Sequence, residues 1–98
     1  MHAVDLISEA QQLAESIGFE VRREWLGERV GGACRLGTRW VLFSDLSLSA
    51  NEQLEQIVNA LRSSPLLPAN FQASTHLQRL LQYGMPDDTL SVAKTPSR

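Results

Sequence analysis

The sequence contains only one cysteine and two histidines, and it has no long apolar stretch. The single cysteine, Cys34, cannot form a disulfide within the chain, so a reducing, cytoplasmic setting is expected. A zinc site needs about four Cys, His or carboxylate ligands at close spacing, and neither histidine lies near Cys34 in the sequence. No apolar run approaches the ~20 residues that span a bilayer. We therefore expect no metal, no cofactor and no membrane partner.

A large excess of charge of either sign is also missing. Nine basic and eleven acidic residues give a net charge of −2. Nucleic-acid-binding domains usually carry a clear basic excess, so this balance argues against a nucleic-acid partner. The 43% hydrophobic and 20% charged content is ordinary for a globular protein. A chain of 98 residues has room for one core, and we assign a single domain to residues 1–84.

Three segments carry helix signals. Apolar residues recur every three or four positions over residues 3–17, which predicts an amphipathic helix. Ser49 and Glu52 have the spacing of a capping box, and they predict a second helix that ends by residue 64, before Pro65. A third, shorter helix is expected over residues 74–83, where leucines form an apolar side.

Three segments carry strand signals. Apolar and charged residues alternate over residues 19–26, which is the period of a half-buried strand. Residues 33–36 and 39–44 read as two further strands, and Gly37 and Thr38 fit the two-residue turn of a hairpin between them.

The last of these strands has an apolar run from Trp40 to Phe43, so both of its faces should be covered in part. We predict an α+β fold of two layers, in the order helix, three-stranded antiparallel sheet, helix and short C-terminal helix. The alternative is a sheet whose second face is covered by a partner molecule. Residues 65–73 should pack over an open edge of the core, and residues 85–98 are expected to form a flexible tail.

Few side chains suggest catalysis. Cys34 could act as a nucleophile with His76 as its base, but a free cysteine in a strand more often packs as a small apolar residue, and we expect Cys34 to pack. Glu20 and Glu24 could form an acid–base pair, although a solvated strand face is favoured. Asp45 follows the central strand, where a turn role is favoured. No catalytic residue is assigned.

The glycine-rich loop from Gly27 to Gly32 forms neither of the common phosphate-binding motifs, and it precedes a strand rather than a helix. A small-molecule or catalytic site at this loop, using Cys34, Asp45 or Glu24, remains an alternative function.

Arginine and tryptophan side chains supply the main candidate for binding. Both residue types are enriched at interface hot spots, and a short sheet with unpaired edges favours strand addition or dimer formation. The candidate surface comprises Arg22, Arg23, Trp25, Arg35, Arg39 and Trp40. We predict a non-enzymatic module that binds a protein partner or a second copy of itself. Two alternatives stay open for these residues: weak binding of single-stranded nucleic acid, and stacking of arginine on tryptophan within the chain.

Three short motifs carry a resemblance: Gly-Phe-x-Val-Arg at 18–22, Leu-Phe-x-Asp-Leu at 42–46 and Asn-Glu-Gln-Leu-Glu-Gln at 51–56. They resemble a family of short, uncharacterised bacterial proteins. Residues 3–62 are also similar to the N-terminal part of zincin-like metallopeptidase domains, where a similar hairpin leads into the zinc-binding helix. That helix requires His-Glu-x-x-His, whereas residues 50–63 contain no histidine. The resemblance therefore implies no metallopeptidase chemistry in this chain.

Overall fold

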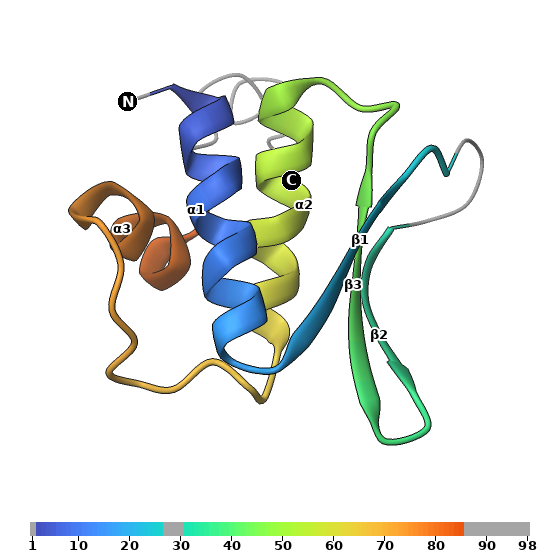
Figure 1. Cartoon of the computed structure of the whole chain (residues 1–98). Helices are drawn as coiled ribbons and strands as arrows, with labels where there is room; N and C mark the ends of the chain where they lie inside the picture. Colours follow the sequence, from blue (N-terminus) through green and yellow to red (C-terminus); the bar gives the residue numbers. More distant parts are fainter. Residues whose placement is uncertain (1, 27–30, 86–98) are drawn as a thin grey trace, which may run out of the picture.

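The computed structural model describes residues 2–26 and 31–85 of the chain. Its elements are α1 (Ala3–Ser16), β1 (Phe19–Glu24), β2 (Gly32–Leu36), β3 (Arg39–Asp45), α2 (Ala50–Ser63) and α3 (Thr75–Tyr83). Figure 1 shows α1 and α2 side by side on one face of the sheet, with α3 on the far side of this helix pair. The chain therefore has the predicted α+β fold, in which the sheet and the helix pair are the two main layers.

The helices follow the local signals in the sequence. The Ser49 hydroxyl accepts a hydrogen bond from the backbone N–H of Glu52 at 3.2 Å, and the Glu52 carboxylate accepts one from the N–H of Ser49 at 3.0 Å. The predicted capping box is thus confirmed, and such caps typically stabilise a helix by ~1 kcal/mol. Gly18, which follows α1, has a φ of +116°, a conformation that residues with a Cβ rarely adopt.

The sheet is mixed, so the prediction of a purely antiparallel sheet was wrong. Its strand order is β1-β3-β2, and β3 pairs antiparallel with β2 but parallel with β1. The turn at Gly37 places β2 beside β3. Val41 and Leu42 point to opposite faces of β3 and both are 0% exposed, so both faces of this strand are covered at least in part, as predicted. β1 pairs with β3 and not with β2, the strand that follows it in the sequence. Since β1 and β3 both run opposite to β2, the pair that they form is parallel.

One core cluster joins the sheet to all three helices. Phe19 and Leu42 contribute to it from β1 and β3. The buried leucine, isoleucine and valine residues of the helices in this cluster are Leu6, Leu54, Ile57, Val58, Leu61, Leu77, Leu80 and Leu81. Since side chains alternate along a strand, Val21, Ala33 and Trp40 lie on the same, helix-facing side of the sheet.

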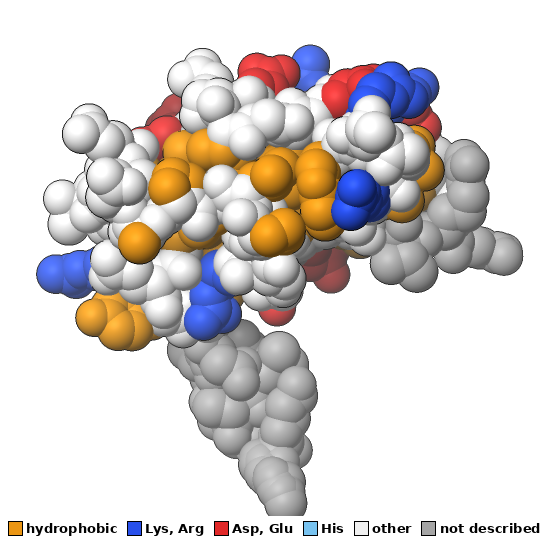
Figure 2. Space-filling model, turned by 90° about the horizontal axis from the view of Figure 1, so that it is seen from below, with side chains coloured by type: hydrophobic (Ala, Val, Ile, Leu, Met, Phe, Trp, Pro, Cys, Tyr) orange, Lys and Arg blue, Asp and Glu red, His pale blue; other side chains and the backbone are white. Residues whose placement is uncertain are grey.

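The connection between α2 and α3 closes one end of the core. Leu66, Leu67 and Phe71 are half-buried against the core cluster, which confirms the packing predicted for residues 65–73. Figure 2 views the molecule from this end and shows hydrophobic side chains gathered in a band across it. This end of the molecule therefore exposes apolar side chains.

Met85, the first residue of the expected tail, is half-buried against the core. Residues 86–98 and residues 27–30 lie outside the described residues, so the expectations of a flexible tail and of a glycine-rich loop stay predictions there. Among the helices of the described part, none has the length and apolar character needed to cross a membrane.

Candidate interaction surface and adjoining groove

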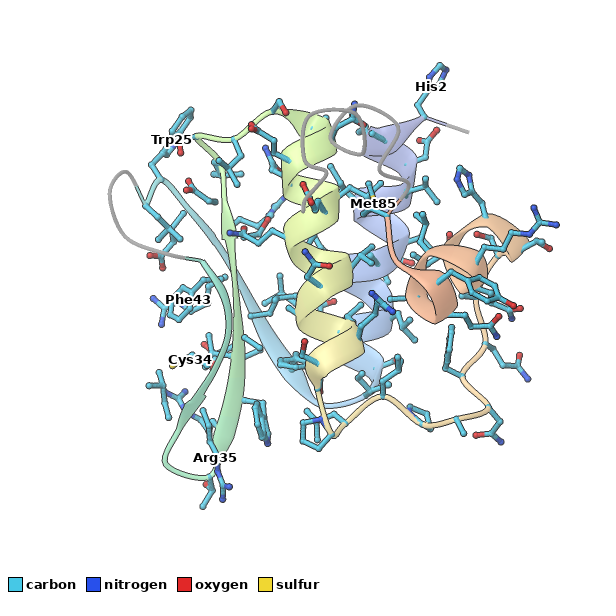
Figure 3. The ribbon with its side chains drawn as sticks, turned by 180° about the vertical axis from the view of Figure 1, so that it is seen from behind. His2, Trp25, Cys34, Arg35, Phe43 and Met85 are labelled. Atoms are coloured by element: carbon cyan, nitrogen blue, oxygen red, sulfur yellow. The ribbon has the colours of Figure 1, made fainter. Side chains whose placement is uncertain are left out.

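One face of the sheet points away from the helices, and no other element of the described residues covers it (Figure 1). We call it the open face, and its side chains are Glu20, Arg22, Glu24, Cys34, Leu36, Arg39, Val41 and Phe43. Figure 3 shows Phe43 and Cys34 projecting from the sheet on the side opposite to the helices. Val41 is fully buried between its neighbours, Phe43 is half-buried and Leu36 is 42% exposed. The open face therefore has an apolar centre.

Charged side chains flank this centre in pairs of opposite sign. Arg39 Nη1 lies 2.9 Å from Glu20 Oε1, which joins β3 to β1. Arg22 Nε lies 3.1 Å from Glu24 Oε2, along the edge strand β1. The four side chains are 36% to 61% exposed, so each pair adds little to stability. Their main effect is to balance the charge beside the apolar centre, with two acids and two bases.

Cys34 is exposed on the open face, so the expectation that it packs as a buried residue was wrong. It lies on β2, an edge strand whose outer face is not covered by another described element. His76 is on α3, on the other side of the helix pair (Figure 1), so the structure does not bring it to Cys34. The two residues do not form a nucleophile and base.

The six residues of the predicted interaction surface do not share one face of the sheet. Arg22 and Arg39 lie on the open face. Arg23, Arg35 and Trp40 occupy alternate positions that belong to the helix-facing side. The arginines are thus divided between the two sides of the sheet and do not form one continuous basic surface.

The two tryptophans have different surroundings. Trp40 packs edge-on against Phe19, with ring centroids 6.1 Å apart, and the Arg35 guanidinium carbon lies 6.0 Å from the centroid of its ring. This contact is the stacking within the chain that was one of the alternatives for these residues. Trp25 is 72% exposed beyond the end of β1 (Figure 3).

A groove of about 670 Å³ lies between β2 and α2, on the helix-facing side of the sheet. The strands supply Gly32, Ala33 and Trp40 to its lining, and α2 supplies polar side chains that include Glu52 and Glu55. Sequence reasoning missed this groove, because it depends on α2 lying over the sheet without filling the space beside its edge strand. The small residues at the start of β2 were the only local signal.

At Gly31, in the lining of the groove, the Gln56 side chain of α2 lies close to the backbone. A Cβ at Gly31 would lie 2.5 Å from Nε2 of Gln56, so a larger residue would displace the Gln56 side chain. Gln56 Oε1 accepts a hydrogen bond from the backbone N–H of Asp45 at 3.1 Å. Glycine at this position therefore permits a contact that ties α2 to the end of β3.

Asp45 stabilises the turn after β3, as we predicted from its position at the end of this strand. Its Oδ1 accepts hydrogen bonds from the Ser47 hydroxyl at 2.7 Å, the Ser47 N–H at 2.9 Å and the Leu26 N–H at 3.2 Å. These bonds join the turn after β3 to the segment after β1. The Ser47 hydroxyl first, and then the two backbone N–H groups, hold the pKa of Asp45 below its ordinary value of 3.8, although burial opposes them.

Replacement of Asp45 by asparagine is expected to reduce the dependence of stability on pH. Because the pKa of Asp45 is lower in the folded than in the unfolded chain, its carboxylate stabilises the fold above about pH 4, and this contribution is lost as the pH falls through the folded pKa. Asp45→Asn should lower the free energy of unfolding at neutral pH and flatten its fall in acid, as measured by denaturant unfolding. Glu15→Gln, which makes the corresponding change from acid to amide at an exposed position of α1, is the matched control. An unchanged pH dependence for Asp45→Asn would contradict this role.

The alternative site at the glycine-rich loop stays a prediction, because residues 27–30 lie outside the described residues. Neither the groove nor a second hollow of about 400 Å³ beside Phe19 and Arg39 is lined by Cys34, Asp45 or Glu24. Residues 2–26 and 31–85 also hold no group of three or more His, Cys, Asp or Glu side chains placed to bind a metal ion.

The site features are therefore an open sheet face with an apolar centre and, at one sheet edge, a groove with both apolar and acidic lining, on a small α+β fold. Comparisons with family models, with curated proteins and with solved structures found no match for this chain. Any function assigned to the chain has to come from its own geometry.

Proposed function

We propose that the protein is a non-enzymatic interaction module that forms a homodimer through the open face of its sheet. The observation that supports this proposal is the one-sided sheet, with α1 and α2 on one face and accessible Phe43, Leu36 and Cys34 on the other. Covering apolar surface contributes about 25 cal/mol per Å², and sheets commonly hide such a face by packing on a second sheet. A second copy would supply that sheet.

The charges beside the apolar centre suit a second copy. A two-fold interface is formed by the same patch on both subunits, so the patch must be complementary to itself. Glu20 and Glu24 balance Arg22 and Arg39, so two copies of the open face can approach without a net repulsion between these groups. The small net charge of the whole chain, −2, opposes association only slightly. A reducing, cytoplasmic setting is part of the proposal and is supported by the single cysteine.

The positions of the arginines favour a protein partner over single-stranded nucleic acid. A nucleic-acid strand is held by a continuous basic groove with aromatic platforms, whereas Arg22 and Arg35 lie on opposite sides of the sheet. The resemblance to zincin-like domains adds no chemistry to the proposal, because α2 contains no histidine.

Phe43→Arg is expected to abolish the dimer, because it places a charge at the centre of the covered face. In sedimentation velocity at micromolar concentration, the wild type should behave as a dimer and the variant as a monomer. Leu36→Arg, on the exposed edge strand, should weaken the dimer in the same direction. Circular dichroism would establish that both variants are folded.

Tyr83→Arg is the matched control. Tyr83 is 79% exposed on α3, away from the sheet, so this change adds the same charge to the protein without touching the proposed interface. The variant should remain a dimer. A wild-type protein that is a monomer throughout the micromolar range would overturn the proposal, and so would a Tyr83→Arg variant that dissociates as readily as Phe43→Arg.

A further inference from the structure

The strand β2 has one free edge. It pairs with β3 along Gly32–Leu36, and the sheet ends with β2 on that side among the described residues. An edge strand presents unpaired backbone N–H and C=O groups, and an extended peptide can add to them as a further strand. Residues 33–36 are all exposed, so their side chains leave this edge accessible.

The groove between β2 and α2 adjoins this free edge. A strand added to β2 would lie about 4.8 Å from it, and every second side chain would point to the helix-facing side of the sheet, where the groove lies. Gly32 and Ala33 are small, so they leave room for those side chains. The groove's volume of about 670 Å³ lies within the range that is usual for ligand-binding pockets.

The charge of the groove selects the chemistry of its occupant. The ionisable side chains in its lining are Glu52 and Glu55, both acidic and both exposed on α2. Ala33, Trp40 and Leu48 supply apolar lining beside them. Glu52 Oε1 already accepts the N–H of Ser49 in the capping box, and Glu55 is exposed on α2 three residues further along the helix.

We propose that this groove binds an extended segment of a partner protein that carries basic side chains at alternate positions and adds to β2 as a fourth strand. Backbone hydrogen bonds to β2 supply affinity, and Glu52 and Glu55 select the basic side chains. The site does not depend on the proposed dimer, because the groove and the open face lie on opposite sides of the sheet.

To test this proposal, the full chain is titrated with a short, end-blocked peptide in which lysine alternates with valine. Binding is measured by isothermal titration calorimetry. The wild type should bind this peptide and should not bind the peptide in which glutamate replaces lysine. Glu55→Lys should weaken binding roughly tenfold or more, because an attraction becomes a repulsion. Glu15→Lys, which makes the same charge change on α1, should bind as the wild type does.

Strand addition has its own control. A lysine–valine peptide with a central proline keeps its charges but loses a backbone donor, so its binding should be lost. The folded Phe43→Arg variant should bind the lysine–valine peptide as tightly as the wild type, which separates this site from the dimer interface. No binding by the wild type, equal losses for Glu55→Lys and Glu15→Lys, or equal binding of the proline peptide would each overturn the proposal.

Discussion

Leu42→Ala is expected to lower the free energy of unfolding by about 2–5 kcal/mol, the range for removing a large buried aliphatic side chain. Leu42 is 0% exposed on the central strand, and it belongs to the core cluster that α1, α2 and α3 share with the sheet. Its removal leaves a cavity between the sheet and the helix pair. Denaturant unfolding, followed by the fluorescence of Trp25 and Trp40, would measure the change.

Leu36→Ala is the control for this change. Leu36 is 42% exposed on the edge strand β2, so the same substitution should cost less than about 1 kcal/mol. Both variants should be compared at a protein concentration too low for association, because Leu36 also lies on the open face. Equal losses for the two variants would contradict the placement of the core between β3 and the helices.

Glu9→Ala is expected to release the start of α3 from α1. The Glu9 carboxylate accepts hydrogen bonds from the Ser74 N–H and the Ser74 hydroxyl, both at 2.7 Å, and the Ser74 oxygen in turn accepts the N–H of Leu77 at 3.3 Å. Hydrogen bonds to a charged group contribute about 1.5–3 kcal/mol, so a loss of that order is expected. Hydrogen exchange would detect it as faster exchange of the α3 amides.

The effect of Glu9→Ala should stay local at first, because the other end of α3 is held independently. Arg62 of α2 donates from Nε to the carbonyl of Leu81 at 3.2 Å. Glu9→Gln keeps one acceptor and should lose less stability than Glu9→Ala, and Glu15→Ala, an exposed control on α1, should leave α3 unchanged. Wild-type protection of the α3 amides in Glu9→Ala would contradict this anchoring role.

Features set by neighbouring residues could be predicted from the sequence. The spacing of Ser49 and Glu52 indicated the start of α2, and the structure contains both hydrogen bonds of the capping box. The apolar spacing over residues 3–17 indicated α1, which the structure places at Ala3–Ser16. The alternation of Glu20, Arg22 and Glu24 placed them on one face of β1, which the register of the sheet bears out. Each of these signals is contained within one helix or one strand.

The pairing of the strands could not be predicted from local sequence signals. The turn at Gly37 identifies β2 as one partner of β3, but no residue in or near β1 indicates with which strand β1 pairs. The apolar run from Trp40 to Phe43 was the useful signal, since a strand apolar on both faces suits the centre of a sheet. In the structure β3 is central, with β2 on one side and β1 parallel to it on the other.

The candidate sites depend on that same long-range arrangement. Cys34 was expected to be buried because a free cysteine in a strand usually packs as a small apolar residue, but β2 is an edge strand and the helices lie on one face only. The groove arises where α2 passes beside β2, which are separated in the sequence by β3. Neither feature follows from the spacing of residues along the chain.

The reaction of Cys34 with a thiol reagent tests the central claim most directly. Cys34 is the only thiol in the chain, and it lies on the open face that a second copy is proposed to cover. The labelling rate should slow as the concentration of the wild type rises through the micromolar range, and it should stay constant for Phe43→Arg. A wild-type rate that is independent of protein concentration would contradict the proposed dimer.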